Sequence, residues 1–245
     1  ERSPDGALRS FLAGGSEFDD NYTTELGADW EHRFSPNFST KLIGLYTSNN
    51  VEQSDVFDTY TAPATFLTRT QLRATNGGER VARLTSTWRV SDDHTLEFGG
   101  EGAFNFRETD LNIFNQPQGG VRVRVPLAVS KARVEEIRGE GFITDVWTVN
   151  DALTLETGLT FEASRITQTG DQSKEREFSY PKPRITATWA VDDSSQLRAS
   201  LQRDIAQLDF AEFSSTVDFI NAASTQGNPD LVPEKAWKAR VEWET

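Results

Sequence analysis

Residues Trp147–Phe161 read WTVNDALTLETGLTF and contain a turn signal, Asn150-Asp151, between two candidate strands. The arm after the turn places apolar residues at alternating positions, namely Leu153, Leu155, Leu159, Phe161 and Ala163. Polar residues or glycine stand between them, namely Thr154, Glu156, Gly158, Thr160 and Glu162. Because side chains alternate between the two faces of a strand, this period of two predicts a β-hairpin with one apolar and one polar face.

The same hairpin pattern recurs three times. Residues 88–96 read WRVSDDHTL and residues 189–197 read WAVDDSSQL, so both repeat a tryptophan, a valine, an acidic turn and a leucine. Residues 30–38, WEHRFSPNF, are a looser copy. The chain is therefore predicted to repeat one hairpin plan, with a tryptophan a few residues before each short turn.

Alternating segments predict nine strands, or ten if the N-terminal residues contribute one. They are Thr23–Ser35, Phe38–Asn49, Glu79–Ser91, Thr95–Glu108, Arg133–Val149, Leu153–Gln168, Arg184–Val191, Gln196–Arg203 and Lys235–Glu244. Short turns join one end of each hairpin, whereas the other ends are predicted to be long loops at 50–78, 109–131, 169–182 and 204–233. Long structureless connections are uncommon in compact domains and are usually functional.

Composition limits the class of protein. The 245 residues carry a net charge of -13, which argues against a nucleic-acid binder because such a protein needs a basic surface. There is no cysteine, so a disulfide framework, a thiol nucleophile and a thiolate metal site are excluded. No apolar run approaches the ~20 residues that a membrane helix requires.

A membrane barrel and a soluble sheet both fit the alternation alone. Several predicted strands reach ten or more residues, close to the ~9 to 11 that a tilted strand needs to cross a bilayer. Charged residues on the opposite face suit a wet lumen, namely Arg83, Arg89, Glu97, Glu101, Arg107, Glu156 and Glu162. The tryptophans near the short turns, Trp30, Trp88, Trp147 and Trp189, predict an interfacial girdle in contact with outer-membrane lipid. The chain is thus predicted to be an all-β antiparallel transmembrane barrel, with a soluble barrel or sandwich as the alternative.

Residues 226–234 read QGNPDLVPE and lead directly into the last alternating strand. This loop resembles the Gly-Asn-Pro-x-Leu-x-Pro-Glu signature of TonB-dependent outer-membrane receptors. Tyr180-Pro-Lys-Pro-Arg184 and Leu197–Arg203 resemble the strands that precede that signature in the family. The close match covers about residues 180–245, and the hairpin cadence extends it loosely over the rest.

The resemblance implies a bacterial outer-membrane importer with a barrel of about twenty-two strands around an N-terminal plug. It implies import of a scarce nutrient, such as a ferric siderophore, cobalamin or a saccharide, with energy from the TonB complex acting through the plug. Residues 1–245 are expected to be a β-barrel segment of such a receptor, without the plug and the closing strands. Two other functions stay open: a small outer-membrane barrel acting as an adhesin or passive pore, and a secreted soluble β-protein that binds a partner through long loops.

No pattern of catalytic, cofactor-binding or metal-ligating residues is apparent, so the protein is not expected to be an enzyme or to hold a cofactor. Both histidines, His32 and His94, lie beside short turns and are expected to be interfacial or turn residues. Nutrient binding is assigned to aromatic and polar residues of the long loops. The candidates are Tyr60, Phe66, Arg69, Phe114, Gln116, Phe213 and Phe219.

Overall fold

The computed structural model describes residues 10–61, 65–213, 216–218, 223–225, 227–228 and 230–245. Over these residues the protein is almost entirely antiparallel β-sheet. Nine strands pair in chain order: β1 (Ser10–Ser35), β2 (Phe38–Thr61), β3 (Thr65–Arg89), β4 (His94–Pro117), β6 (Lys131–Asn150), β7 (Leu153–Gly170), β8 (Lys174–Ala190), β9 (Gln196–Ile205) and β12 (Lys235–Glu244). The tenth strand of this sheet, β5 (Val123–Val125), pairs with the far end of β4.

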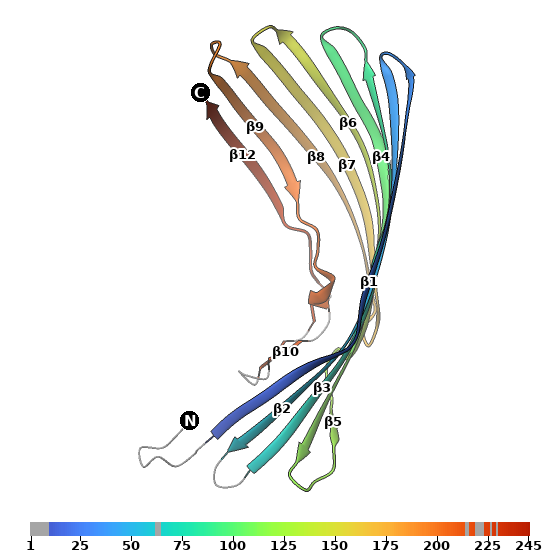
Figure 1. Ribbon diagram of the computed structural model, residues 1–245, viewed down its shortest axis with the longest axis vertical. Coiled ribbons are helices and arrows are strands. Elements are labelled where there is room, and N and C mark those ends of the chain that lie inside the picture. The colour runs from blue at the N-terminus through green and yellow to red at the C-terminus, as the bar shows by residue number, and fades with distance from the viewer. Residues whose placement is uncertain (1–9, 62–64, 214–215, 219–222, 226, 229) are drawn as a thin grey trace.

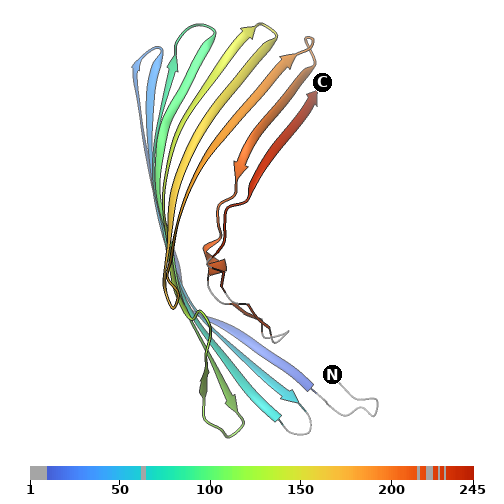
Figure 2. The same ribbon diagram turned by 180° about the vertical axis from the view of Figure 1, so that it is seen from behind.

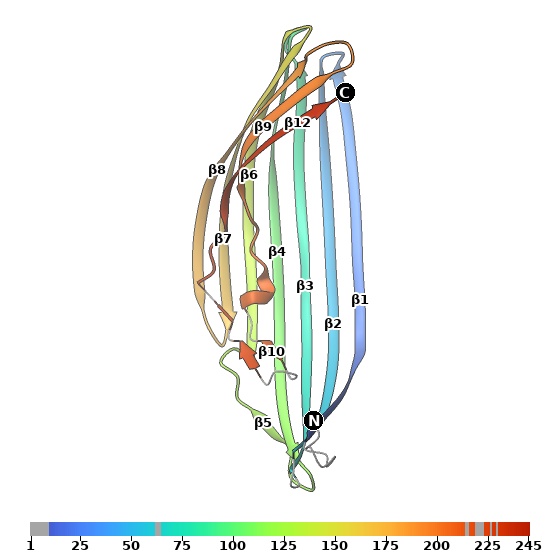
Figure 3. The same ribbon diagram turned by 90° about the vertical axis from the view of Figure 1, so that its left-hand side faces the viewer.

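The sheet is strongly curved and, within the described residues, open (Figure 1). β1 and β12 form its two edges and do not pair with each other. The view from behind and the view into the hollow show the same single curved wall, and residues 206–213, which follow β9, lie on its concave side (Figures 2 and 3). The predicted fold class is therefore confirmed: the chain forms part of an antiparallel β-barrel.

The strand register sorts the side chains onto two faces. On β7 and β8, for example, Phe161 pairs with Pro181 and Leu155 pairs with Ala187, so apolar residues stay on one face from strand to strand. The apolar face is convex and exposed. Its large exposed members include Leu26, Trp30, Leu84, Trp88, Ile137, Ile143, Leu159, Phe161, Ile185, Trp189, Leu201 and Val241. The soluble alternative requires this face to be buried in a dry interior, and the structure places it outside.

The four short turns share one local design. In each, a side-chain oxygen accepts a hydrogen bond from the backbone N–H two residues further on, at 2.9 to 3.3 Å. Serine, asparagine and aspartate favour such turns because their side chains can replace a backbone acceptor. The capping residues are Ser35, Ser91, Asn150 and Asp192.

The other ends of the hairpins differ from the prediction. Residues 50–61 and 65–78 continue the β2–β3 ladder without interruption, so most of the predicted loop 50–78 is strand. In the same way, β4 runs to Pro117, and only residues 171–173 separate β7 from β8. These strand ends, which form the distal arms of the sheet, carry polar residues on both faces. The period of two is therefore hidden in the sequence, although the strands remain paired there. The prediction of long loops was wrong at 50–78 and 169–182, and partly wrong at 109–131.

The connection between β9 and β12 is the long one that remains. It holds a 3-10 helix, η1 (Phe210–Phe213), and two short paired strands, β10 (Thr216–Asp218) and β11 (Ala223–Thr225). Phe213 is buried against Val134 and Ile166 of the sheet. This contact forms the small hydrophobic core that anchors the connection on the concave face.

Candidate functional site

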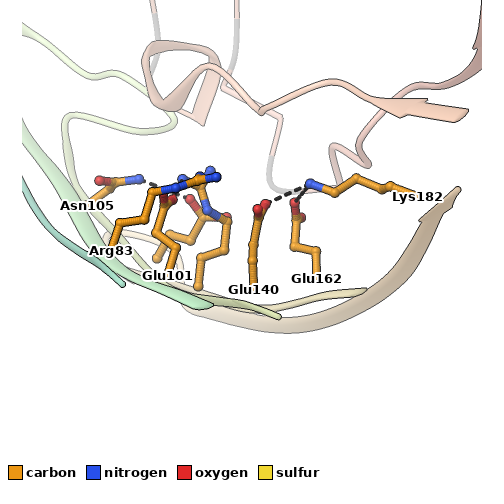
Figure 4. Close-up of polar contacts among 8 residues, drawn as sticks. Arg83, Glu101, Asn105, Glu140, Glu162 and Lys182 are labelled. Atoms are coloured by element: carbon orange, nitrogen blue, oxygen red, sulfur yellow. Dashed lines mark hydrogen bonds and ion pairs between the residues drawn. The ribbon is translucent and has the colours of Figure 1, made fainter. Parts of the chain in front are cut away.

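Charged side chains meet across the concave face of the sheet (Figure 4). The first cluster joins three neighbouring strands, β3, β4 and β6. Arg83 Nη1 lies 3.2 Å from Glu101 Oε2, and Arg138 Nη2 lies 3.3 Å from Glu101 Oε1. This Arg83–Glu101–Arg138 triad contains two guanidinium groups and one carboxylate, so it carries a formal charge of about +1 at neutral pH.

The second cluster lies beside the first, on β6, β7 and β8. Lys182 Nζ lies 2.7 Å from Glu140 Oε1 and 2.7 Å from Glu162 Oε2. The three side chains are only 20%, 15% and 12% exposed, respectively. This Glu140–Lys182–Glu162 triad carries a formal charge of about -1. Two oppositely charged triads therefore stand side by side on the wall.

Hydrogen bonds tie further polar groups into this wall. Asn105 Nδ2 donates to Glu136 Oε2 at 3.2 Å, and Arg184 Nη2 donates to Thr144 Oγ1 at 3.0 Å and approaches Glu156 Oε1 at 3.0 Å. Partly buried ion pairs of this kind contribute little net stability unless hydrogen bonds complete them, and they cost free energy when one partner is lost. The arrangement fixes a patterned polar surface more than it strengthens the sheet.

Sequence reasoning identified part of this wall. The charges of the polar face, including Glu101 and Glu162, were assigned to a wet lumen from their alternating positions. Arg138, Glu140 and Lys182 were missed as partners. Glu140 stands between Gly139 and Gly141, and Lys182 between Pro181 and Pro183, so apolar alternation is weak there. The contact between β6 and β8 side chains across β7 depends on strand register.

Most of the candidate ligand residues lie on strands instead of loops. Tyr60 and Phe66 are register partners on β2 and β3. Arg69 Nε donates to Asn115 Oδ1 at 3.0 Å, which ties β3 to β4. These residues belong to paired strands, because the ladder continues through the region predicted as loop.

The remaining ligand candidates are divided among three environments. The guanidinium carbon of Arg122 lies 4.0 Å from the centre of the Phe114 ring on β4, and Gln116 Nε2 donates to the carbonyl of Gly120 at 3.4 Å. Phe213 is buried in the core of the β9–β12 connection, which leaves its ring almost no free surface in this conformation. Phe219 lies outside the described residues. That these residues bind ligand stays a prediction.

The predicted girdle tryptophans share one face. Trp30, Trp88, Trp147 and Trp189 are all exposed and belong to the convex face, towards the end of the sheet that carries the short turns. Trp243 of β12 pairs with Leu197, the residue that also pairs with Trp189, and therefore extends the row to the sheet edge. Their contact with lipid headgroups stays a prediction.

A carboxylate fixes the opposite end of the sheet. Asp171, in the turn after β7, accepts hydrogen bonds from the backbone N–H groups of Lys131 at 2.8 Å and Ser130 at 2.7 Å. These bonds favour the ionised form and lower the pKa of the Asp171 carboxyl. The turn is thereby tied to the start of β6.

The described part of the chain contains neither a candidate metal site nor a candidate membrane-spanning helix. No group of three or more His, Cys, Asp or Glu side chains there is arranged to hold a metal ion. Among those same residues no helix has the length and apolar character to cross a membrane.

An antiparallel sheet that is apolar outside and charged inside defines part of a β-barrel of the outer-membrane type. The family model "TonB dependent receptor-like, beta-barrel" matches residues 2–242, so the chain belongs to that family. No curated protein matches the chain by sequence.

Solved structures share the fold at low identity. The ferric citrate transporter FecA, in its unliganded form, matches with a TM-score of 0.51 and 13% identity over 95% of this chain and 32% of FecA. The hemophore receptor HasR of Serratia marcescens, a double mutant in complex with its hemophore HasA and heme, matches with a TM-score of 0.52 and 12% identity. That match covers 96% of this chain and 46% of HasR. The chain therefore spans less than half the length of either structure.

Proposed function

We propose that residues 1–245 form the wall of an active transport receptor that imports a scarce nutrient across the bacterial outer membrane. The observation that carries this proposal is the membership in the TonB-dependent receptor family, together with the two faces of the sheet. The exposed apolar convex face suits lipid, and the ion-paired concave face suits a hydrated lumen.

The nutrient belongs to the ferric siderophore, cobalamin or saccharide class. Two solved structures that share the fold are a ferric citrate transporter and a hemophore receptor, which favours an iron compound among these classes. In this proposal, the external arms and the concave wall bind the nutrient. Passage then requires a plug, through which the TonB complex supplies energy.

The direct test measures nutrient uptake by the full-length receptor in bacteria that lack it. We expect uptake of one of the three nutrient classes to appear with the receptor and to disappear when TonB is deleted or the proton gradient is collapsed. Uptake that persists without TonB would instead indicate a passive pore. No uptake of any class, with receptor present in the outer membrane, would contradict the proposal.

Membrane placement has a separate test. Trp30, Trp88, Trp147 and Trp189 should lie at the interface, so their fluorescence should be quenched more by lipids brominated near the headgroup than near the chain end. The full-length receptor in vesicles serves for this measurement, with each of these tryptophans replaced by phenylalanine in turn. Equal quenching at both depths, or none, would contradict a girdle.

A further inference from the structure

An arginine stands between two aromatic rings on the convex face of the sheet. Arg80 of β3 pairs in register with Tyr46 of β2 and Phe104 of β4. Its guanidinium carbon lies 5.8 Å from the centre of the Tyr46 ring and 5.6 Å from the centre of the Phe104 ring. Arg80 alternates in step with Leu84 and Trp88 of the same strand, so it belongs to the convex face. The two rings therefore flank an exposed guanidinium on that face.

The charge of Arg80 has no counter-charge among the residues that the structure describes, where it forms neither an ion pair nor a hydrogen bond. The surrounding convex-face positions of β2, β3 and β4 are all uncharged. They are Gly44, Tyr46, Ser48, Gly78, Ala82, Gly102, Phe104 and Phe106. Arg133, another convex-face arginine beside an aromatic ring, differs because Glu108 and Glu135 lie 2.9 Å and 2.6 Å from its guanidinium nitrogens. Arg80 thus offers a positive charge that an external anion can pair with.

Arg80 lies about one membrane thickness from the tryptophan row. Positions 80 and 88 of β3 are eight residues apart, which corresponds to about 26 Å of strand. A tilted strand crosses a bilayer in ~9 to 11 residues, so Arg80 falls at the opposite interface from Trp88 when the convex face is in lipid. Tyr46 stands at the same level, because Phe38 pairs with Trp88 and Tyr46 pairs with Arg80. An arginine on a lipid-facing surface is costly at the midplane and tolerated near the headgroups, which matches this level.

The convex surface next to Arg80, on the side of the short turns, leaves room for acyl chains. The adjacent row of residues there is Gly44, Ala82 and Gly102. A Cβ atom built at Gly44 or Gly102 would meet no atom within 4 Å. Leu84, in the row after that, is 47% exposed. A lipid whose headgroup contacts Arg80 can therefore lay its chains on an open, apolar part of the wall.

Phosphate is the anion that fits this position and chemistry. A guanidinium donates parallel N–H bonds to two phosphate oxygens, and the bond is stronger because both groups are charged. The flanking rings of Tyr46 and Phe104 restrict the Arg80 side chain, so less conformational entropy is lost when it binds. A nutrient that passes through the lumen does not reach the convex face, whereas the phosphate of a membrane lipid lies at this level.

We propose that Arg80, flanked by Tyr46 and Phe104, binds the phosphate group of a membrane lipid. The short turns of outer-membrane barrels face the periplasm, so the lipid belongs to the outer leaflet. The inference goes beyond nutrient import. It depends on the proposed membrane placement of the convex face and not on the identity of the nutrient.

The test is native mass spectrometry of the full-length receptor in nonionic detergent, titrated with dioleoyl phosphatidic acid or with dioleoylglycerol. These two lipids share their chains and differ in the phosphate. We expect phosphatidic acid to bind more tightly, and Arg80→Gln to weaken its binding at least about fivefold while leaving dioleoylglycerol unaffected. Arg133→Gln is the matched control, because it removes the same charge from the same face at a site where carboxylates already neutralise it. Excess inorganic phosphate should not displace the bound lipid.

A second variant covers the case in which Arg80→Gln does not fold, as judged by thermal unfolding. Tyr46→Leu removes one flanking ring and keeps the charge, so it should weaken the binding of phosphatidic acid in part. Binding of phosphatidic acid that neither folded variant weakens would overturn the proposal.

The remaining outcomes are equally decisive. Equal affinity for the two lipids, or an equal loss for Arg80→Gln and Arg133→Gln, would overturn the assignment of a phosphate site to Arg80. Displacement of the lipid by inorganic phosphate would indicate a site for the free anion and overturn the lipid assignment. No nutrient takes part in this experiment, so TonB-dependent uptake without a preference for phosphatidic acid would overturn this inference alone. An Arg80-dependent preference without any uptake would contradict the transport proposal alone.

Discussion

Lys182 on β8 lies with its Nζ 2.7 Å from Oε1 of Glu140 on β6, although the whole of β7 separates the two strands. The contact is possible because the sheet is curved, so that side chains on its concave face converge (Figure 4). Glu162 of β7 lies between them and shares the same ammonium group at 2.7 Å. One lysine thus links three strands of the lumen wall.

Replacing Lys182 with methionine should destabilise the wall. The substitution leaves the carboxylates of Glu140 and Glu162 close together without a counter-charge, at an expected cost of about 1–3 kcal/mol after allowance for partial hydration. Thermal unfolding of the full-length receptor in detergent measures the change. Lys238→Met is the matched control, because Lys238 pairs with Asp204 but is largely exposed. Equal losses for both variants would show that the triad has no special role.

Arginine should be tolerated on one face of β8 and rejected on the other. Ile185 belongs to the convex face, where Ile185→Arg should cost about 2–4 kcal/mol near the membrane midplane. Thr186→Arg, one residue further, places the same charge on the concave face opposite Glu156. The folded fraction after insertion into vesicles should fall only for the first variant. A fall for the second variant alone would reverse the assignment of the two faces.

The tie between the β7–β8 turn and β6 should weaken in acid. The pKa of Asp171 is lowered because its carboxylate accepts the N–H groups of Lys131 and Ser130, so the tie is present in full above the ordinary value of about 4. Its contribution is lost as the pH falls through the lowered value, when the carboxylate is protonated. Hydrogen exchange of a peptide covering residues 126–133, corrected for intrinsic rates, should therefore quicken below about pH 4. The variant Asp171→Asn should remove this pH dependence of hydrogen exchange. The same pH dependence in the variant would show that Asp171 is not responsible for it.

Removing the ring of Phe213 should release the β9–β12 connection without unfolding the sheet. Phe213 is 2% exposed and packs on Val134 and Ile166, and loss of a buried phenylalanine side chain costs about 3–5 kcal/mol. Chymotrypsin should then cleave Phe213→Ala within residues 206–233 much faster than the unmodified receptor. Phe210→Ala, which alters a partly buried ring, should have a smaller effect. Simultaneous loss of the whole sheet would contradict a local anchor.

Prediction from sequence succeeded where the environment of the two faces differs. Across the region of the sheet that carries apolar side chains on one face, alternation identified the strands, their order and the short turns. It failed in the distal arms, where Thr59 and Leu67, for example, are register partners in a segment predicted as loop. There both faces are largely polar, so hydrophobicity carries no period, and only backbone pairing reveals the strand.

The sequence by itself determined which residues share a face, because a strand alternates its side chains whatever its neighbours are. It also determined the turns, because each capping oxygen acts on a backbone N–H only two residues away. Only the tertiary structure decided that Lys182 reaches Glu140, that Phe213 packs on the concave face, and that residues 207–210 lie beside Asn105 and Arg107. Lys182 and Glu140 are 42 positions apart, and Phe213 is 47 and 79 positions from Ile166 and Val134. Such contacts depend on register and curvature, which no local pattern encodes.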